Sequence, residues 1–152
     1  MESNCTKAMN SKMDKAANIN YSDINIGDIF SFERKISKQD VMDFAKLSGD
    51  FNPLHVDPDF GKKSQFKKNI AHGMLAGSLF STLVGMHCPG EKSLYMSQTL
   101  NFRLPLYYDD AITVKGTVIN KNDSIKMVTL KTEILKDGKV VIDGEAKASL
   151  LR

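Results

Sequence analysis

Cysteine, long apolar runs and a leader-like segment are what this chain has least of. Cys5 and Cys88 are too few for a disulfide framework, and no metal-ligand spacing surrounds them, which favours two idle thiols in a reducing compartment. Residues 1–20 lack the continuous apolar core of a signal peptide. No apolar run approaches the roughly 20 residues that cross a bilayer. We therefore expect a soluble, cytoplasmic protein with no membrane partner and no metal or other cofactor.

Excess charge is also small, since 21 Lys and Arg against 18 Asp and Glu give a net charge of +3. The sequence has no basic helix or aromatic-rich basic ribbon, so nucleic acid is not an expected partner. A mild positive bias is still compatible with a phosphate-bearing ligand. With 152 residues, the chain is expected to form one domain over 21–152 behind a flexible tail over 1–20, where large apolar side chains are few.

One polar stretch, residues 48–57, reads Ser-Gly-Asp-Phe-Asn-Pro-Leu-His-Val-Asp. Pro53 disfavours helical geometry in the residue before it, and Gly49 is a natural helix stop, so a fixed turn is expected here rather than a helix or strand. Such a turn can hold Asp50 and His55 towards one point, an arrangement that suggests proton transfer. The alternative is a helix-capping carboxylate and a half-buried histidine that make ordinary loop hydrogen bonds.

Helices are expected in three places. The first follows the capping-box pair Ser37 and Asp40, and the second follows Asp57-Pro58. The third spans 70–86, which is apolar on nearly every face and must be buried. Strands are expected over 29–36, 94–104, 111–120, 125–135 and 139–150. Alternation predicts a covered face formed by Ile112, Val114, Gly116 and Val118 in one run and by Ile125, Met127 and Thr129 in the next. The pattern predicts an α+β fold in which an antiparallel meander wraps the buried helix.

The stretch from Leu47 to Asp57 resembles the signature of the MaoC-like, (R)-specific enoyl-CoA hydratase family, which runs small-Gly-Asp-x-Asn-Pro-aliphatic-His-x-acid. Residues 70–74 resemble the start of that family's central helix, and 101–106 resemble its usual strand and turn. Asp109-Asp110 stands where Gly-Asp is common in that turn. The likeness extends over residues 22–152.

This resemblance implies a hotdog fold, an antiparallel sheet wrapped around a long central helix, usually as a homodimer. It implies reversible hydration of trans-2-enoyl-CoA to (R)-3-hydroxyacyl-CoA, or dehydration of related thioesters. Asp50 and His55 would be the catalytic acid/base pair, and Asn52 would fix the turn or orient the water. The backbone N–H of Gly73 would stabilise negative charge on the thioester oxygen.

Six further residues are expected to bind substrate: His72, Met74, Leu75, Ser78, Phe66 and Lys67. His72 is interpreted as structural or substrate-lining rather than catalytic, and His87 as a helix-end residue without an evident partner. Lysines 62, 63, 67 and 68 surround Phe66 and form either a solvated loop or a lip that attracts an anionic ligand.

Three other functions compete with CoA-thioester hydration. The first is a 3-hydroxyacyl-[acyl-carrier-protein] dehydratase, whose lysine-rich lip would face an acidic carrier. The second is a hotdog subunit that holds acyl-CoA without turnover, for which an intact Asp50/His55 pair would be superfluous. A thioesterase is disfavoured, because 73–86 contains no Asp or Glu to act as nucleophile or base.

Overall fold

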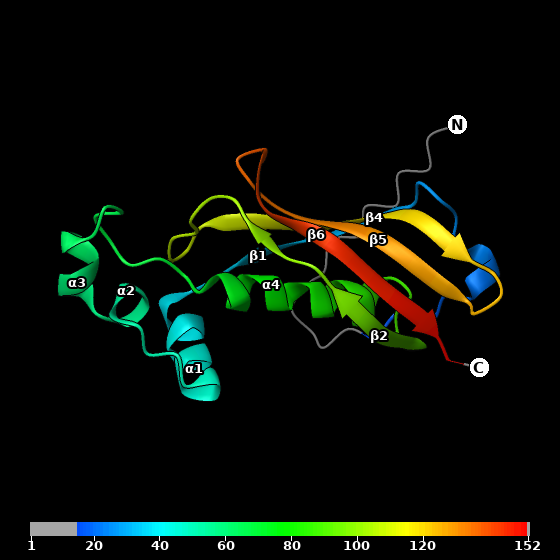
Figure 1. Cartoon of the computed structure of the whole chain (residues 1–152), viewed down its shortest axis with the longest axis horizontal. Coiled ribbons are helices and arrows are strands. Elements are labelled where there is room, and N and C mark those ends of the chain that lie inside the picture. The colour runs from blue at the N-terminus through cyan, green and yellow to red at the C-terminus, as the bar shows by residue number, and fades with distance from the viewer. Residues whose placement is uncertain (1–14, 152) are drawn as a thin grey trace.

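The computed structural model describes residues 15–151. Its helical elements are η1 (Tyr21–Asp23), α1 (Lys38–Ser48), α2 (Pro53–Val56), α3 (Pro58–Lys63), α4 (Gly73–Thr82) and the π-helical turn η2 (Leu83–His87). Its strands are β1 (Ile29–Lys35), β2 (Ser93–Gln98), β3 (Asn101–Phe102), β4 (Ala111–Asn122), β5 (Met127–Lys136) and β6 (Lys139–Leu150). The expected α+β layout is confirmed. In Figure 1, α4 runs along one face of the sheet, while α1, α2 and α3 gather beyond one end of it.

The sheet is antiparallel, with strand order β1-β4-β5-β6-β2, and β3 also pairs with β6. The prediction of a simple meander is therefore right only for β4, β5 and β6. The run expected over 94–104 pairs with β6 instead of β4, and it is divided into β2 and β3. The break falls at Thr99, which passes so close to β6 that a Cβ at Gly144 would lie 1.8 Å from the Thr99 carbonyl oxygen.

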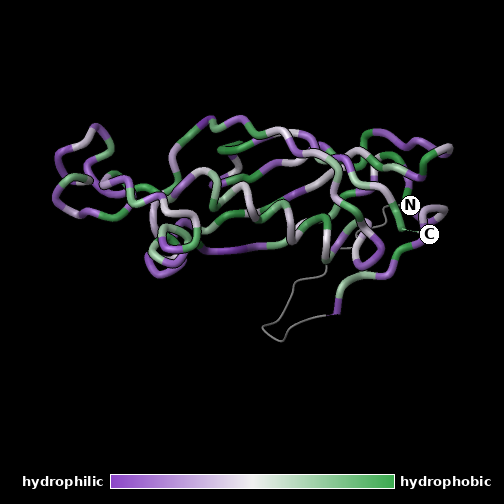
Figure 2. Tube along the Cα trace, turned by 60° about the horizontal axis from the view of Figure 1, so that its bottom comes forward, coloured by the Kyte–Doolittle hydropathy of each residue, from purple (hydrophilic) through white to green (hydrophobic). Residues whose placement is uncertain are grey.

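The covered face predicted for β4 is confirmed, since Ile112, Val114, Gly116 and Val118 are all buried. At Gly116 a side chain is excluded by the central helix, because a Cβ there would lie 2.7 Å from Cδ2 of Leu83. This close approach lets η2 lie directly against the sheet. Figure 2 shows hydrophobic residues recurring along the helix and strands, whereas the loop after α3 is largely hydrophilic.

The covered face predicted for β5 is wrong by one residue. Ile125 is 55% exposed, and the strand starts only at Met127. Lys126 has a φ of 49°, so it belongs to a left-handed turn, and Ile125 falls before the strand. Within the strand, Thr129 is 7% exposed but Met127 is only partly buried. The buried face towards the helix is formed by Val128, Leu130, Thr132 and Ile134.

Helix α1 begins and ends as the sequence predicts. The Ser37 hydroxyl accepts from the Asp40 N–H (3.1 Å), and the Asp40 carboxylate accepts from the Ser37 N–H (2.8 Å). Gly49 closes the helix with a φ of 80°, a left-handed conformation that favours glycine. The Ser37 N–H, helped by the nearby Arg34, lowers the pKa of Asp40.

Asp40→Ala is expected to lower the free energy of unfolding by about 1 kcal/mol at neutral pH, the usual effect of losing a cap. Folding lowers the pKa of this carboxyl, so it stabilises the folded protein at pH values above 3.8, the ordinary pKa of an aspartate. This stabilisation is lost as the pH falls through the lowered pKa of the folded state. The wild-type advantage in urea unfolding should therefore shrink below that pH. The control is Asp43→Ala, which removes an exposed carboxylate from the same helix. A wild-type advantage that is constant with pH would contradict the carboxylate's role.

The predicted tail, 1–20, lies mostly outside the described residues. Within the described part, the Ala17 N–H donates to the Met86 carbonyl (2.9 Å), and Asn18 forms a bridge with Gly90. The packed chain thus begins before residue 21.

Cys5 is outside the described residues, and burial raises the pKa of Cys88 to about 12, which makes it a poor nucleophile. Within 15–151, no helix combines the length and apolar composition needed to cross a bilayer.

Candidate active site

The polar stretch after α1 forms a chain of local hydrogen bonds. Oδ1 of Asp50 accepts from the Asn52 N–H (3.1 Å), and Oδ1 of Asn52 accepts from the Leu54 N–H (3.0 Å). Asn52 therefore caps α2, with Pro53 at the first helical position, where a missing N–H costs nothing. The expectation that this stretch contains no helix is wrong for these four residues. The turn-fixing role predicted for Asn52 agrees with this cap.

His55 is oriented by a backbone carbonyl. Its Nδ1 lies 2.9 Å from the Ile70 carbonyl oxygen, which can only accept, so Nδ1 carries the proton. In the neutral ring, Nε2 then offers a lone pair, as a general base requires. The hydroxyl of Tyr108 donates to the His55 carbonyl and holds the backbone of α2 in place.

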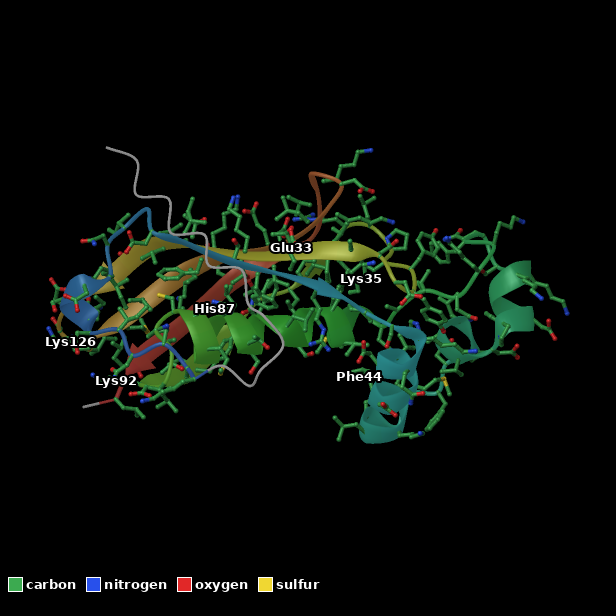
Figure 3. All side chains as sticks on the ribbon, turned by 180° about the vertical axis from the view of Figure 1, so that it is seen from behind. Glu33, Lys35, Phe44, His87, Lys92 and Lys126 are labelled. Atoms are coloured by element: carbon green, nitrogen blue, oxygen red, sulfur yellow. The ribbon has the colours of Figure 1, made fainter. Side chains whose placement is uncertain are left out.

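His72 is the most buried polar residue of the site, with a side chain only 2% exposed. Its Nε2 donates to the Asp50 carbonyl oxygen (3.0 Å) and lies 3.9 Å from Oδ2 of the same residue. Its ring lies against that of His55, with centroids 4.0 Å apart, and meets the edge of Phe44 at 5.0 Å. Figure 3 shows Phe44 on α1, near the end of α4 where His72 stands. Nδ1 of His72 is buried and has no hydrogen-bond partner within the described residues.

Asp50, His55 and His72 open onto one cavity of about 460 Å³. Gly73 also lines it as the first residue of α4, so its N–H stands at a helix end where intrahelical acceptors are missing. Of the residues predicted to bind substrate, Phe66, His72 and Met74 line this cavity. The remaining wall is formed by Ile70, Ala71, Phe102, Arg103, Leu104, Pro105, Leu106 and Ile142.

Three residues predicted to bind substrate do not line this cavity. Leu75 and Ser78 line a separate hollow beside Phe44 and Leu47, because they lie on the flank of α4 that faces α1. The Ser78 hydroxyl donates to the Leu75 carbonyl (2.6 Å). Lys67 is exposed in a left-handed turn with a φ of 61° and lies outside the cavity wall.

The most important residue that the sequence did not indicate is Asn69. It is 8% exposed, and its Nδ2 lies within hydrogen-bond distance of the carbonyls of Pro53 (3.2 Å), Leu54 (2.9 Å) and Asp57 (2.9 Å). Asn69 thereby fastens both ends of α2, which carries His55. No local signal marks it, because its acceptors lie 12 to 16 residues earlier in the chain.

Arg103, also not predicted, stands at the rim of the cavity. Its guanidinium donates to both carboxylate oxygens of Asp143, through Nε (3.0 Å) and Nη2 (3.2 Å). These bonds raise the pKa of Arg103 and, together with one from Asn101, lower the pKa of Asp143. The pair leaves little net charge at this rim.

The only potential metal-binding group within the described residues combines Asp50, His55 and His72, whose ligating atoms lie within 4.8 Å of one another. Nε2 of His72 is committed as a donor to the Asp50 carbonyl. That leaves one carboxylate and one imidazole nitrogen, fewer than the three protein ligands of a typical catalytic zinc. The group therefore suits acid/base chemistry better than metal binding.

The comparisons with known proteins agree with this geometry. Residues 24–139 match the model of the MaoC like domain. The chain belongs to the MaoC-like family. It is 40% identical over 126 residues to an (R)-specific enoyl-CoA hydratase of Rhodospirillum rubrum, covering 83% of this chain and 88% of the relative. It is 37% identical to a mitochondrial 3-hydroxyacyl-[acyl-carrier-protein] dehydratase of Arabidopsis thaliana, covering 84% and 78%.

An unliganded R-hydratase from Pseudomonas aeruginosa has the same fold, with a TM-score of 0.84, 35% identity and coverage of 89% of this chain and 87% of that one. The hotdog fold expected from the sequence is thereby confirmed. This MaoC-like chain is a hydratase or dehydratase by family. Its departure from the common Gly-Asp turn also has a physical explanation. Asp109 has a φ of 62°, a left-handed conformation that glycine adopts freely and aspartate tolerates.

Proposed function

We propose that this protein is an (R)-specific enoyl-CoA hydratase, which reversibly hydrates trans-2-enoyl-CoA to (R)-3-hydroxyacyl-CoA. The observation that carries the proposal is that Asp50, His55 and Gly73, the first residue of α4, all line one cavity. Hydration needs an acid/base pair and a donor for the thioester oxygen, and this wall supplies both. No cofactor is required for this chemistry.

In the forward reaction, a water lies between the Asp50 carboxylate and Nε2 of His55. Its oxygen bonds to C3 of the enoyl group while the pair accepts one of its protons. The C2–C3 double bond opens, and negative charge moves to the thioester oxygen, where the Gly73 N–H donates to it. The pair then returns a proton to C2 and recovers its starting protonation state. Dehydration is the same path in reverse.

The direct test is incubation of the purified protein with crotonyl-CoA, with the loss of enoyl absorbance and the release of free thiol followed in parallel. Loss of absorbance without thiol, and formation of (R)-3-hydroxybutyryl-CoA on a chiral column, are the expected results. Thiol release would indicate a thioesterase. Saturable binding without turnover would indicate an acyl-CoA-binding subunit, and either outcome would overturn the proposal.

A carrier-protein dehydratase is the second candidate, favoured by the exposed lysines 62, 63, 67 and 68 on either side of the cavity-lining Phe66. The likeness to the plant dehydratase points the same way. The two candidates differ in partner, because an acidic carrier would contact a wide basic surface whose attraction weakens with salt. Measuring kcat/KM on crotonyl-CoA and on a crotonyl carrier protein at two salt concentrations separates them. We expect a higher kcat/KM on the carrier substrate only if this basic surface is its docking site.

Gly73→Ala keeps the backbone N–H, but its Cβ is expected to obstruct the approach of the thioester oxygen to that donor and to reduce kcat by up to about 10²–10³-fold, the cost of losing one oxyanion donor in other enzymes. A Cβ at this position would lie 2.7 Å from Cδ1 of Phe102, so this half-exposed ring, which also lines the cavity, must move. The matched control is Gly85→Ala, whose Cβ would meet nothing within 4 Å. If both variants kept wild-type turnover of crotonyl-CoA, the thioester would not lie against the Gly73 N–H.

The hotdog homodimer expected from the family remains part of the proposal. Its support is a set of large apolar side chains left half exposed around the free edge of the sheet and the start of α4: Met74, Leu94, Met96, Phe102 and Leu104. Such a concentration is typical of an interface. Light scattering coupled to gel filtration should give twice the mass of the chain.

A further inference from the structure

The hydrogen bonds of the site converge on four consecutive residues, 70–73. The Ile70 carbonyl accepts from His55, and the Ala71 N–H donates to the Leu106 carbonyl (2.7 Å), which anchors this segment to the cavity wall. His72 donates to the Asp50 carbonyl, and Gly73 lines the cavity at the start of α4, where its N–H has no intrahelical acceptor. This segment therefore joins the acid/base half of the site to the oxyanion half.

Within this segment, His72 alone contacts both halves. Its main chain caps α4 and continues directly into Gly73, while its ring reaches back to the Asp50 carbonyl (3.0 Å). Its ring also lies against His55. Asp50 itself is half exposed and bonds through its carboxylate only to its own turn among the described residues, so this turn has few other restraints.

The burial of His72 argues against a role in packing alone. Nδ1 is buried without a hydrogen-bond partner among the described residues, which is unfavourable, and an aromatic hydrocarbon ring of similar size would avoid that penalty. What a histidine adds here is the Nε2–H donor. The neighbouring Phe44 edge and His55 ring supply contacts that phenylalanine could keep equally well.

We propose that His72 is a positioning residue whose Nε2–H···O=C bond to Asp50 fixes the catalytic turn relative to the Gly73 N–H. The proposal rests on the hydratase function above and assigns His72 a role other than substrate binding. Displacements of about 1 Å in an active site can cost on the order of 100-fold in rate, so one such bond has a measurable effect on kcat.

Three variants separate the donor from the ring. His72→Phe keeps the ring and removes the donor, His72→Gln restores a donor at the position of Nε2 without the ring, and His72→Asn carries the same amide on a shorter side chain. We expect kcat on crotonyl-CoA to fall about 10- to 100-fold in the Phe and Asn variants, with KM little changed. The Gln variant should recover most of the loss. The unfolding midpoint of the Phe variant should lie within about 4 °C of wild type.

Equal losses in the Gln and Phe variants, or wild-type kcat in the Phe variant, would overturn the proposal. A Phe variant that loses activity only in proportion to its stability would also overturn it. If the wild-type protein turns over no thioester, the proposed function fails, but crystal structures of the variants still decide the positioning role. Asp50 should be displaced relative to Gly73 in the Phe and Asn variants and unmoved in the Gln variant.

Discussion

Asp50→Asn is expected to lower kcat for crotonyl-CoA hydration by about 10²–10⁴-fold, the usual contribution of a positioned acid or base. Asparagine has the same shape, and its Oδ1 can still accept from the Asn52 N–H, so the turn should survive. Only the charge and the proton affinity are lost. The measurement is steady-state kinetics, with circular dichroism to verify folding.

Asp57→Asn is the matched control, because it makes the same chemical change in the same segment. Oδ1 of Asp57 caps α3 by accepting from the N–H groups of Asp59 (2.9 Å) and Phe60 (3.2 Å). Asparagine is an equally good cap, so activity and stability should stay near wild type. An Asp50→Asn enzyme as active as this control would remove Asp50 from the acid/base pair.

Asn69→Ala is expected to have the largest combined effect on stability and turnover. Three carbonyls share the two N–H bonds of this buried amide, and at roughly 1 kcal/mol for each N–H the free energy of unfolding should fall by about 2 kcal/mol. Because these bonds fasten α2, His55 should lose its alignment and kcat should fall at least about tenfold. Urea unfolding and steady-state kinetics measure the two effects.

Asn101→Ala supplies the comparison for that variant. Asn101 is exposed on β3 and donates one bond to Asp143 (2.9 Å), so its loss should cost less than about 1 kcal/mol and leave kcat unchanged. If both asparagine variants had the same small effects, α2 would be held by contacts other than Asn69.

The sequence predicted those features whose causes are local. The capping box at Ser37 and Asp40, the left-handed Gly49 and the Pro58 helix start depend on interactions within a few residues. The alternation of β4 is also readable, because Ile112, Val114, Gly116 and Val118 recur at every second position on one covered side. The exclusion of Ile125 from β5 is not readable, since a left-handed Lys126 has no sequence signature as strong as glycine.

The same distinction between local and long-range causes applies to the candidate site. The signature from Leu47 to Asp57 identified the family, and Asp50 and His55 do face one cavity with Gly73. Spacing cannot distinguish the flank of α4 that lines this cavity from the flank that faces α1, where Leu75 and Ser78 line a separate hollow. Arg103 and its partner Asp143 are 40 residues apart, a pairing that only the register of the sheet creates.

Helix α2, which carries His55 and follows the Asp50 turn, lies with α3 beyond one end of the sheet, and the two helices bury little: Gly61 is the only buried residue of α3, and α2 has none. A segment with so few buried contacts opens at a lower free energy than the strands of a shared core. Heat should therefore abolish activity before the sheet melts, and amide hydrogens of α2 should exchange faster than those of β5. The temperature at which this enzyme stops working would then be set by its smallest helices.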